Sequence, residues 1–123
     1  MNIIISNSSG KAIYQQIVDQ IKSNIIKENV EEGEALPSIR NLAKELNISV
    51  ITTKRAYEEL EREGFIQTVP GKGSFIAPQN KELMREKKIK IIEDKLQQVV
   101  KSSKLMGVSL EELIQMLKIL YEE

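Results

Sequence analysis

The chain has 123 residues, of which 41% are hydrophobic and only 4% aromatic, and its 18 basic side chains balance 18 acidic ones. This composition predicts one small domain with an aliphatic core and a short appendage. With no Cys and no His, the chain can form no disulfide, no thiolate or imidazole metal site, and no catalytic site with a cysteine nucleophile or a histidine base. We therefore expect no metal, no cofactor and no enzymatic activity.

Membrane insertion and export are not expected either. The apolar runs fall far short of the roughly 20 residues that a membrane helix needs. The first residues lack the basic stretch and the long apolar stretch of a cleaved leader. These features predict a soluble, cytoplasmic protein.

Residues 12–28 are predicted to form an amphipathic helix. Isoleucines recur there at every fourth position, which places them on one face. They are Ile13, Ile17, Ile21 and Ile25. Gly33 and three acidic residues then follow in a loop that we expect to lie away from the functional face. The acidic residues are Glu31, Glu32 and Glu34.

Two further helices are predicted, joined by a tight turn. Pro37 favours extended backbone before it, and Ser38 is a good N-cap for the next helix. After a turn at residues 47–48, Ser49 is a second N-cap, for a helix that runs to about Glu63. The residues expected to face inward are Ile39, Leu42, Ala43 and Leu46 in the first helix and Thr53, Ala56, Tyr57 and Leu60 in the second.

A β-hairpin is predicted next, because two short β-branched runs at residues 65–69 and 74–77 flank the Gly-rich turn 70–73. The order helix, helix, tight turn, helix, hairpin is that of a winged helix-turn-helix. The expected fold is therefore mainly α with a small β-hairpin wing. The alternative is a small α+β core whose basic residues are merely solvated.

Four sequence blocks in this region resemble the winged-helix domain of GntR-family bacterial transcriptional regulators. Together they cover about residues 10–77, in the family's order and spacing. They are IYQQI at 13–17, LPSIRNLA at 36–43, AYEELEREGFI at 56–66 and GKGSFI at 71–76. The resemblance implies a DNA-binding regulator, with residues 1–78 as its DNA-binding domain.

Residues 79–123 are the second predicted part, and they are too few for the usual GntR effector domain. The run VVKSSKLMGVSLEEL at 99–113 resembles the short helical tail of the YtrA subfamily. That resemblance implies a dimer made by two helices per subunit. The subfamily often accompanies genes for ABC-type transporters.

The residues of this tail predict the two helices independently. The first runs from about Lys81 to Met106 and ends at Gly107, and Ser109 with Glu112 forms a capping box for the second. Two helices of this size cannot hide both apolar stripes against each other, so we expect a symmetric homodimer. Its expected interface residues are Ile89, Ile92, Leu96, Val99, Leu113, Leu117 and Leu120, and the second helix is also expected to bury Leu110, Ile114 and Tyr121. The alternative is a monomer whose tail packs on the winged helix.

Two residues at the start of the second helix are candidates for DNA contact. Ser38 caps a helix whose N-terminal amides can face a phosphate. The resemblance gives Arg40 a DNA-contacting role, and the alternative for Arg40 is a surface ion pair.

The helix after Ser49 is the predicted recognition helix. Its first residues, Val50 and Ile51, are aliphatic where most relatives carry polar or basic residues. They either contact thymine methyl groups in the major groove or pack on neighbouring turns.

Polar candidates follow in the same helix. Thr52 and Lys54 are expected to hydrogen-bond phosphates or bases. Arg55 either joins them or pairs with Glu58 or Glu59, which are close to it on the helix.

The tip of the wing is the last candidate. Gly71 and Gly73 permit a tight turn and a close approach of backbone to DNA, and Lys72 is placed to enter the minor groove or meet a phosphate. The alternative is an ordinary hairpin loop. A nucleotide-binding loop is not expected, because the Walker spacing and a following helix are missing.

The charge balance is unusual for a DNA-binding domain. Residues 1–78 carry nine basic and ten acidic side chains, whereas such domains are often strongly basic. We expect the basic residues to gather on the DNA side, with weak non-specific affinity and tight binding only as a dimer. Those expected there are Arg40, Lys44, Lys54, Arg55 and Lys72.

The predicted function is that of a homodimeric regulator, most simply a repressor, whose two-fold symmetry calls for a pseudo-palindromic operator in double-stranded DNA. The alternative is a protein-interaction module that uses the winged-helix scaffold without DNA. A small effector of unknown class would bind between the tail helices, although no constellation of residues identifies one.

Overall fold

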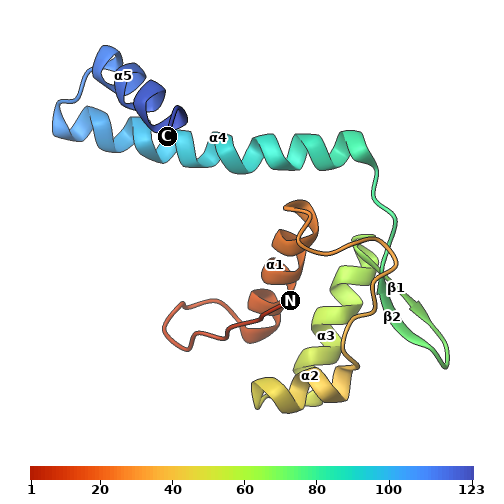
Figure 1. Ribbon diagram of the computed structural model, residues 1–123. Helices are drawn as coiled ribbons and strands as arrows, with labels where there is room; N and C mark the ends of the chain where they lie inside the picture. The colour runs from red at the N-terminus through yellow and green to blue at the C-terminus, as the bar shows by residue number, and fades with distance from the viewer. The chain divides into compact units, whose positions relative to one another are not determined.

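A computed structural model describes the whole chain, residues 1–123, and has five helices and one two-stranded antiparallel sheet (Figure 1). The elements in chain order are α1 (Ile13–Ile26), α2 (Ile39–Leu46), α3 (Val50–Arg62), β1 (Ile66–Val69), β2 (Gly73–Ile76), α4 (Lys81–Met106) and α5 (Leu110–Tyr121). This architecture confirms the prediction of a mainly α fold with a small β-hairpin wing.

The chain forms two compact units, Met1–Met84 and Arg85–Glu123. The division falls inside α4, a few residues beyond the predicted domain boundary at residues 78–79. Met84, in the first turn of α4, is buried, and this turn therefore belongs to the first unit. That the DNA-binding domain ends at residue 78 stays a prediction.

The core of the first unit lies between α1 and α3, which pack against each other, while α2 packs against another part of α3. The largest side chains with almost no exposed surface are Ile17, Val18, Ile21, Thr53, Leu60 and Ile66. All but one of them are aliphatic, as the composition predicted. The predicted inner face of α3, which is Thr53, Ala56, Tyr57 and Leu60, is buried in full.

The wing has a third, irregular member that the sequence did not reveal. β1 and β2 pair from Ile66 opposite Ile76 to Val69 opposite Gly73. Residues 33–36 run along the other edge of β2, where the Gly33 amide donates to the Ile76 carbonyl at 2.8 Å and the Leu36 amide to the Ser74 carbonyl at 2.9 Å. The acidic loop that we expected to lie away from the functional face is thus partly an edge of the wing.

Residues 1–11 form an arm that is tied to α1 by two glutamine side chains. The Gln20 amide group pairs with the backbone of Ile4, accepting at 2.8 Å and donating at 2.7 Å. The Gln16 amide group pairs with the backbone of Ser6 in the same way, at 2.8 and 2.9 Å. The amide group of each glutamine thus forms the two hydrogen bonds that the backbone of a neighbouring strand would otherwise form. No sequence pattern predicted the arm.

An ion pair joins the end of the arm to α1. The Lys11 ammonium lies 2.9 Å from the Asp19 carboxylate, which also accepts a hydrogen bond from Gln15 at 2.8 Å. Partial burial would raise the pKa of Asp19, but the hydrogen bonds from Lys11 and Gln15 outweigh burial and hold the pKa below its ordinary value.

Tyr57 ties α3 to the start of α2. Its hydroxyl donates to the Pro37 carbonyl at 2.7 Å, and its ring is buried. Burial, with a smaller contribution from the charge of Glu45, raises the pKa of the Tyr57 hydroxyl above its ordinary value. The hydroxyl therefore stays protonated and keeps donating to Pro37 well into the alkaline range.

The tail unit consists of α4 from Arg85 onward and of α5, and the two helices are joined at Gly107, whose positive φ of 73° ends α4. The Ser109 hydroxyl accepts from the Glu112 amide at 3.2 Å, which confirms Ser109 as the N-cap of α5. In a full capping box, the Glu112 carboxylate would accept from the Ser109 backbone amide. Here it accepts instead from the Ser109 hydroxyl, at 3.3 Å.

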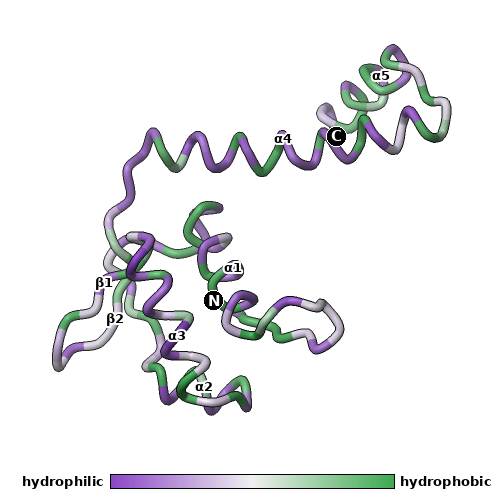
Figure 2. The backbone as a smooth tube through the Cα atoms, turned by 180° about the vertical axis from the view of Figure 1, so that it is seen from behind, coloured by the Kyte–Doolittle hydropathy of each residue, from purple (hydrophilic) through white to green (hydrophobic).

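The apolar residues of the tail remain largely uncovered in the single chain. Hydrophobic positions recur along α4 and dominate α5 (Figure 2). We expected α5 to bury its apolar face, yet no residue of α5 is buried, and Leu117 and Tyr121 are 56% and 88% exposed. Within one chain, the two helices do not hide their stripes.

The substitution Tyr57→Phe should lower the free energy of unfolding near neutral pH by about 1–2 kcal/mol, since the partly buried hydrogen bond to the Pro37 carbonyl is lost. It should also reduce the alkaline sensitivity. Because folding raises the pKa of this hydroxyl, the unfolded chain loses the proton first. Wild-type stability therefore falls as the pH rises above about 10, by at most about 1.4 kcal/mol per pH unit. Urea unfolding at about pH 8 and pH 11 measures both effects, and equal alkaline losses in the two proteins would contradict this account.

Candidate nucleic-acid interface

α2 and α3 form the helix-turn-helix. Asn47 closes α2 in the left-handed conformation, with φ at 55°, and the Ile48 amide donates back to the Ala43 carbonyl at 3.0 Å. Asparagine tolerates this conformation better than most residues, which makes such a short turn feasible. Ser49 begins α3 directly afterwards.

The start of α2 is built around Ser38. The Ser38 hydroxyl accepts from the Asn41 amide at 3.1 Å, as an N-cap does. Arg40 follows in the first turn and is exposed. The Tyr57 hydroxyl of α3 donates to the Pro37 carbonyl, directly before this turn. This hydrogen bond restrains the segment that carries both candidate residues.

The first turn of α3 presents apolar side chains to solvent. Ser49 caps the helix, accepting from the Thr52 amide at 3.0 Å and donating to the Thr52 hydroxyl at 2.8 Å. Val50 is 47% exposed and Ile51 is 81% exposed. The alternative that Ile51 packs on neighbouring turns is therefore wrong for the isolated chain.

The charged side chains in the next turns of α3 form two ion pairs, and neither of them includes Arg55. Glu58 lies 3.9 Å from the Lys54 ammonium. Glu59 pairs with Arg62, whose hydrogen bond lowers the pKa of the Glu59 carboxyl. Of the two alternatives for Arg55, pairing with Glu58 or Glu59 is wrong, because both carboxylates have other partners.

Arg55 instead stacks on an aromatic ring of α1. Its guanidinium carbon lies 3.8 Å from the centre of the Tyr14 ring. Tyr14 was not among the residues that the sequence singled out for function. The only signal was an aromatic residue on the apolar stripe of the first helix, and its partner is decided by the packing of α1 on α3.

The wing tip has the predicted turn. Gly71 and Gly73 have φ values of 76° and 110°, and the Lys72 amide donates to the Val69 carbonyl at 2.9 Å. These conformations favour glycine, so the turn needs both residues. The Lys72 side chain is exposed at the tip.

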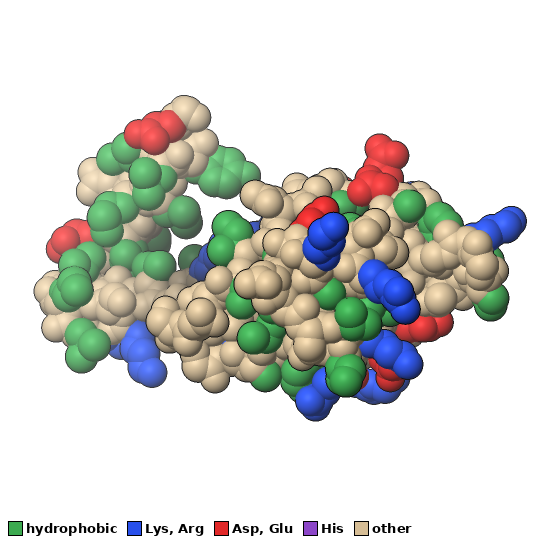
Figure 3. Space-filling view, turned by 90° about the horizontal axis from the view of Figure 1, so that it is seen from below, with side chains coloured by type: hydrophobic (Ala, Val, Ile, Leu, Met, Phe, Trp, Pro, Cys, Tyr) green, Lys and Arg blue, Asp and Glu red, His purple; other side chains and the backbone are tan.

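Basic side chains, with acidic ones among them, lie across the face seen from the α2 side (Figure 3). Apolar side chains lie between them, in keeping with the exposed start of α3. No group of Asp or Glu side chains could hold a metal ion. No helix has both the length and the apolar character required to cross a membrane.

Residues 13–76 match the sequence profile of the bacterial regulatory proteins of the gntR family. The chain belongs to this family. The matched segment runs from α1 to the end of β2 and so includes the whole helix-turn-helix and the wing. The proteins of this family are transcription regulators and not enzymes, as composition had led us to expect.

Relatives extend the likeness into the tail. The chain is 37% identical over 116 residues to the HTH-type transcriptional repressor YtrA of Bacillus subtilis (strain 168), covering 94% of this chain and 89% of that protein. YtrA from Sulfolobus acidocaldarius, a GntR-family transcription factor, has a solved structure that is 36% identical, with a TM-score of 0.60 over 76% of this chain and 96% of that one. These matches confirm the resemblance to the YtrA type.

A second solved structure agrees over almost the full length. A transcriptional regulator from Oenococcus oeni is 28% identical, covers 95% of this chain and 97% of its own, and has a TM-score of 0.77. This gntR-family chain is therefore a transcriptional regulator with a winged helix followed by a short helical tail.

The substitution Ser49→Ala should lower the free energy of unfolding of this regulator by about 1 kcal/mol, since the Thr52 amide loses its capping acceptor. Ser49→Asp should retain most of the stability, because the carboxylate can accept the same bond and suits a helix N-terminus. Urea unfolding of the three proteins tests both expectations. Equal stability of wild type and Ser49→Ala would show that the cap contributes nothing.

Proposed function

We propose that this gntR-family regulator is a homodimeric repressor that binds a pseudo-palindromic operator through α3, the start of α2 and the wing tip. The exposed first turn of α3 carries the proposal, since an apolar residue as exposed as Ile51, at 81%, has no structural role within the chain. The proposed DNA-contacting residues are Ser38, Arg40, Val50, Ile51, Thr52, Lys54, Arg55, Gly71 and Lys72.

The proposed roles differ along this surface. Val50 and Ile51 contact thymine methyl groups in the major groove, and Thr52 and Lys54 bond to bases or phosphates beside them. Arg40 and Lys72 contact the backbone on either side or enter the minor groove. Because residues 1–78 have nine basic and ten acidic side chains, one subunit alone binds weakly and two half-sites are required.

Uncovered apolar side chains support the homodimer. Ile89, Ile92, Leu96 and Val99 on α4 are 46–58% exposed. Leu117 and Leu120 on α5 are more than half exposed, and Leu113 is half-buried. A second tail would cover both stripes, as a symmetric interface does.

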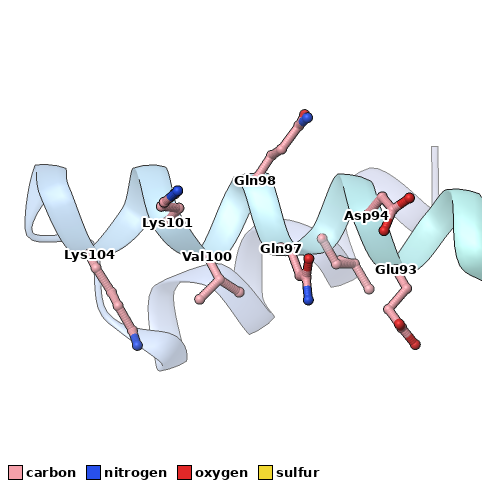
Figure 4. A pocket seen from close by; sticks show the side chains of 8 residues that line it. Glu93, Asp94, Gln97, Gln98, Val100, Lys101 and Lys104 are labelled. Carbon is pink, nitrogen blue, oxygen red and sulfur yellow. The ribbon is translucent and has the colours of Figure 1, made fainter.

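The charges along α4 suggest how two tails meet. An open groove along this helix has an uncharged middle, with two apolar and two glutamine side chains, and charged ends (Figure 4). Its lining residues are Glu93, Asp94, Leu96, Gln97, Gln98, Val100, Lys101 and Lys104. The acidic residues come first in the sequence and the basic residues last.

An antiparallel pair of α4 helices would match these charges. With the two-fold axis near Gln98, Glu93 and Asp94 of each chain lie opposite Lys101 and Lys104 of the other. A parallel pair would instead bring like charges together, so the order of charges favours the antiparallel arrangement.

The remaining parts of the proposal come from the resemblance to the YtrA type. We expect the protein to act in the cytoplasm and to control transporter genes by occluding their promoters. A small effector would enter the groove between α4 and α5, which Val99, Ser103, Val108 and Leu113 help to line.

The substitution Arg40→Ala should weaken operator binding about tenfold or more, since a charged DNA contact is lost from each subunit. Fluorescence anisotropy with a duplex selected by the wild-type protein from random DNA, and with an unrelated duplex, at two salt concentrations, measures the effect. Lys27→Ala is the matched control, because Lys27 is an exposed cation at the far end of α1. A wild-type dimer that selects no sequence would overturn the proposal and favour a protein-interaction module.

Reversing the charges at one end of the α4 groove should raise the dimer dissociation constant about tenfold or more, since several interchain attractions become repulsions. The variants are Lys101→Glu with Lys104→Glu, and Glu93→Lys with Asp94→Lys. Combining all four changes in one chain should restore the dimer, and mixing the two double variants should give heterodimers. Sedimentation equilibrium measures each case, with circular dichroism to verify helix content. Failure of the fourfold variant to recover would contradict the antiparallel pairing.

A further inference from the structure

The contact between Arg55 of α3 and Tyr14 of α1 lies outside the buried core of the first unit. The guanidinium of Arg55 lies over the Tyr14 ring at 3.8 Å from guanidinium carbon to ring centre. Tyr14 is half-buried in the first turn of α1, whereas Arg55 is exposed in α3. The core contact between α1 and α3 is made by fully buried aliphatic residues further along both helices.

The stack determines where the charge of Arg55 is held. The flat face of the guanidinium covers the ring, and its N–H donors point outward from its edge and remain available. The nearby carboxylates do not compete for them, since Glu58 lies beside Lys54 and Glu59 bonds to Arg62. A cation is thus ordered on the protein surface without a carboxylate to neutralise it.

The position of the ring indicates which part of DNA this cation meets. Val50 and Ile51 at the exposed start of α3 are the residues proposed for the major groove. The Tyr14 ring belongs to α1, so the stack draws Arg55 away from that turn and toward the neighbouring helix. In helix-turn-helix proteins, the parts that flank the recognition helix cross the phosphate backbone.

We infer that Tyr14 is a positioning residue that holds Arg55 as a phosphate clamp at the flank of the bound DNA. Arg55 contacts a backbone phosphate and no base edge, and the Tyr14 ring orders its guanidinium before DNA arrives. Binding then avoids most of the entropy cost of immobilising a long side chain. This inference rests on the proposed DNA-binding function and assigns one residue of α1 to it.

A double-mutant cycle tests the inference on the full-length protein with the duplex selected from random DNA. Arg55→Ala should weaken binding to the selected duplex and to single-base variants of it by the same factor. It should also reduce the dependence of log K on log salt by about 0.9 per subunit. Tyr14→Leu should weaken binding about two- to tenfold per subunit while the salt dependence stays, because the charge remains but is no longer ordered.

Conservative and matched variants separate positioning from stability. Tyr14→Phe keeps the ring and should bind as the wild type does, and Arg55→Lys keeps the charge but loses the flat face and should resemble Tyr14→Leu. In an Arg55→Ala background, Tyr14→Leu should have no further effect on affinity. In a Lys54→Ala background it should keep its full effect, since Lys54 lies beside Arg55 in the sequence but does not contact the ring. Thermal unfolding verifies that each variant is folded at the assay temperature.

Three outcomes would overturn the inference. The first is that Tyr14→Leu weakens binding equally with and without Arg55, because the ring would then act by another route. The second is that Arg55→Ala changes the base preference at one operator position, because Arg55 would then contact a base. The third is a wild-type protein that selects no duplex, which would overturn the proposed function as well, so the two failures are distinguishable.

Discussion

The aliphatic contact between α1 and α3 is the interaction on which the rest of the first unit depends. Ile17 and Ile21 of α1 and Leu60 of α3 have no exposed surface, and each such side chain contributes about 1.5–3 kcal/mol when it leaves water. This burial determines which side of α3 faces solvent. The residues of the candidate interface then take their places relative to that contact, either on α3 itself or on α2 and the wing, both of which pack against α3.

Local hydrogen bonds turn this packing into a defined surface. Ser38 and Ser49 cap the two helices, and the Tyr57 hydroxyl joins α3 to the segment before α2. These bonds restrict the first turns of both helices, where the proposed DNA contacts lie. Restricting those turns matters for a domain with no excess of positive charge, since specific contacts have to supply what non-specific attraction does not.

The tail is stabilised in a different way from the first unit, because it has no buried apolar core within one chain. Its exposed leucines, isoleucines and valines have little to gain from burial within one chain and much to gain from a second copy. If the tail pairs as proposed, dimerisation holds two weak half-site binders at a high effective concentration. Assembly and operator affinity would then be linked, and a change that separates the tails would weaken DNA binding without altering a single DNA contact.

The sequence by itself determined the helices, their serine N-caps, the inward face of α3, the hairpin and the winged-helix class. Periodic apolar residues, serines before helices and glycines after them act over a few positions, so they are readable along the chain. It also brought Ser38, Arg40 and the first turn of α3 to attention. Only the tertiary structure decided that residues 33–36 border β2, that Gln16 and Gln20 hold the arm, and that Arg55 stacks on Tyr14 rather than pairing with Glu58 or Glu59. Those partners lie far apart in the sequence. Which of several possible neighbours such a side chain contacts is decided only when packing brings distant elements together.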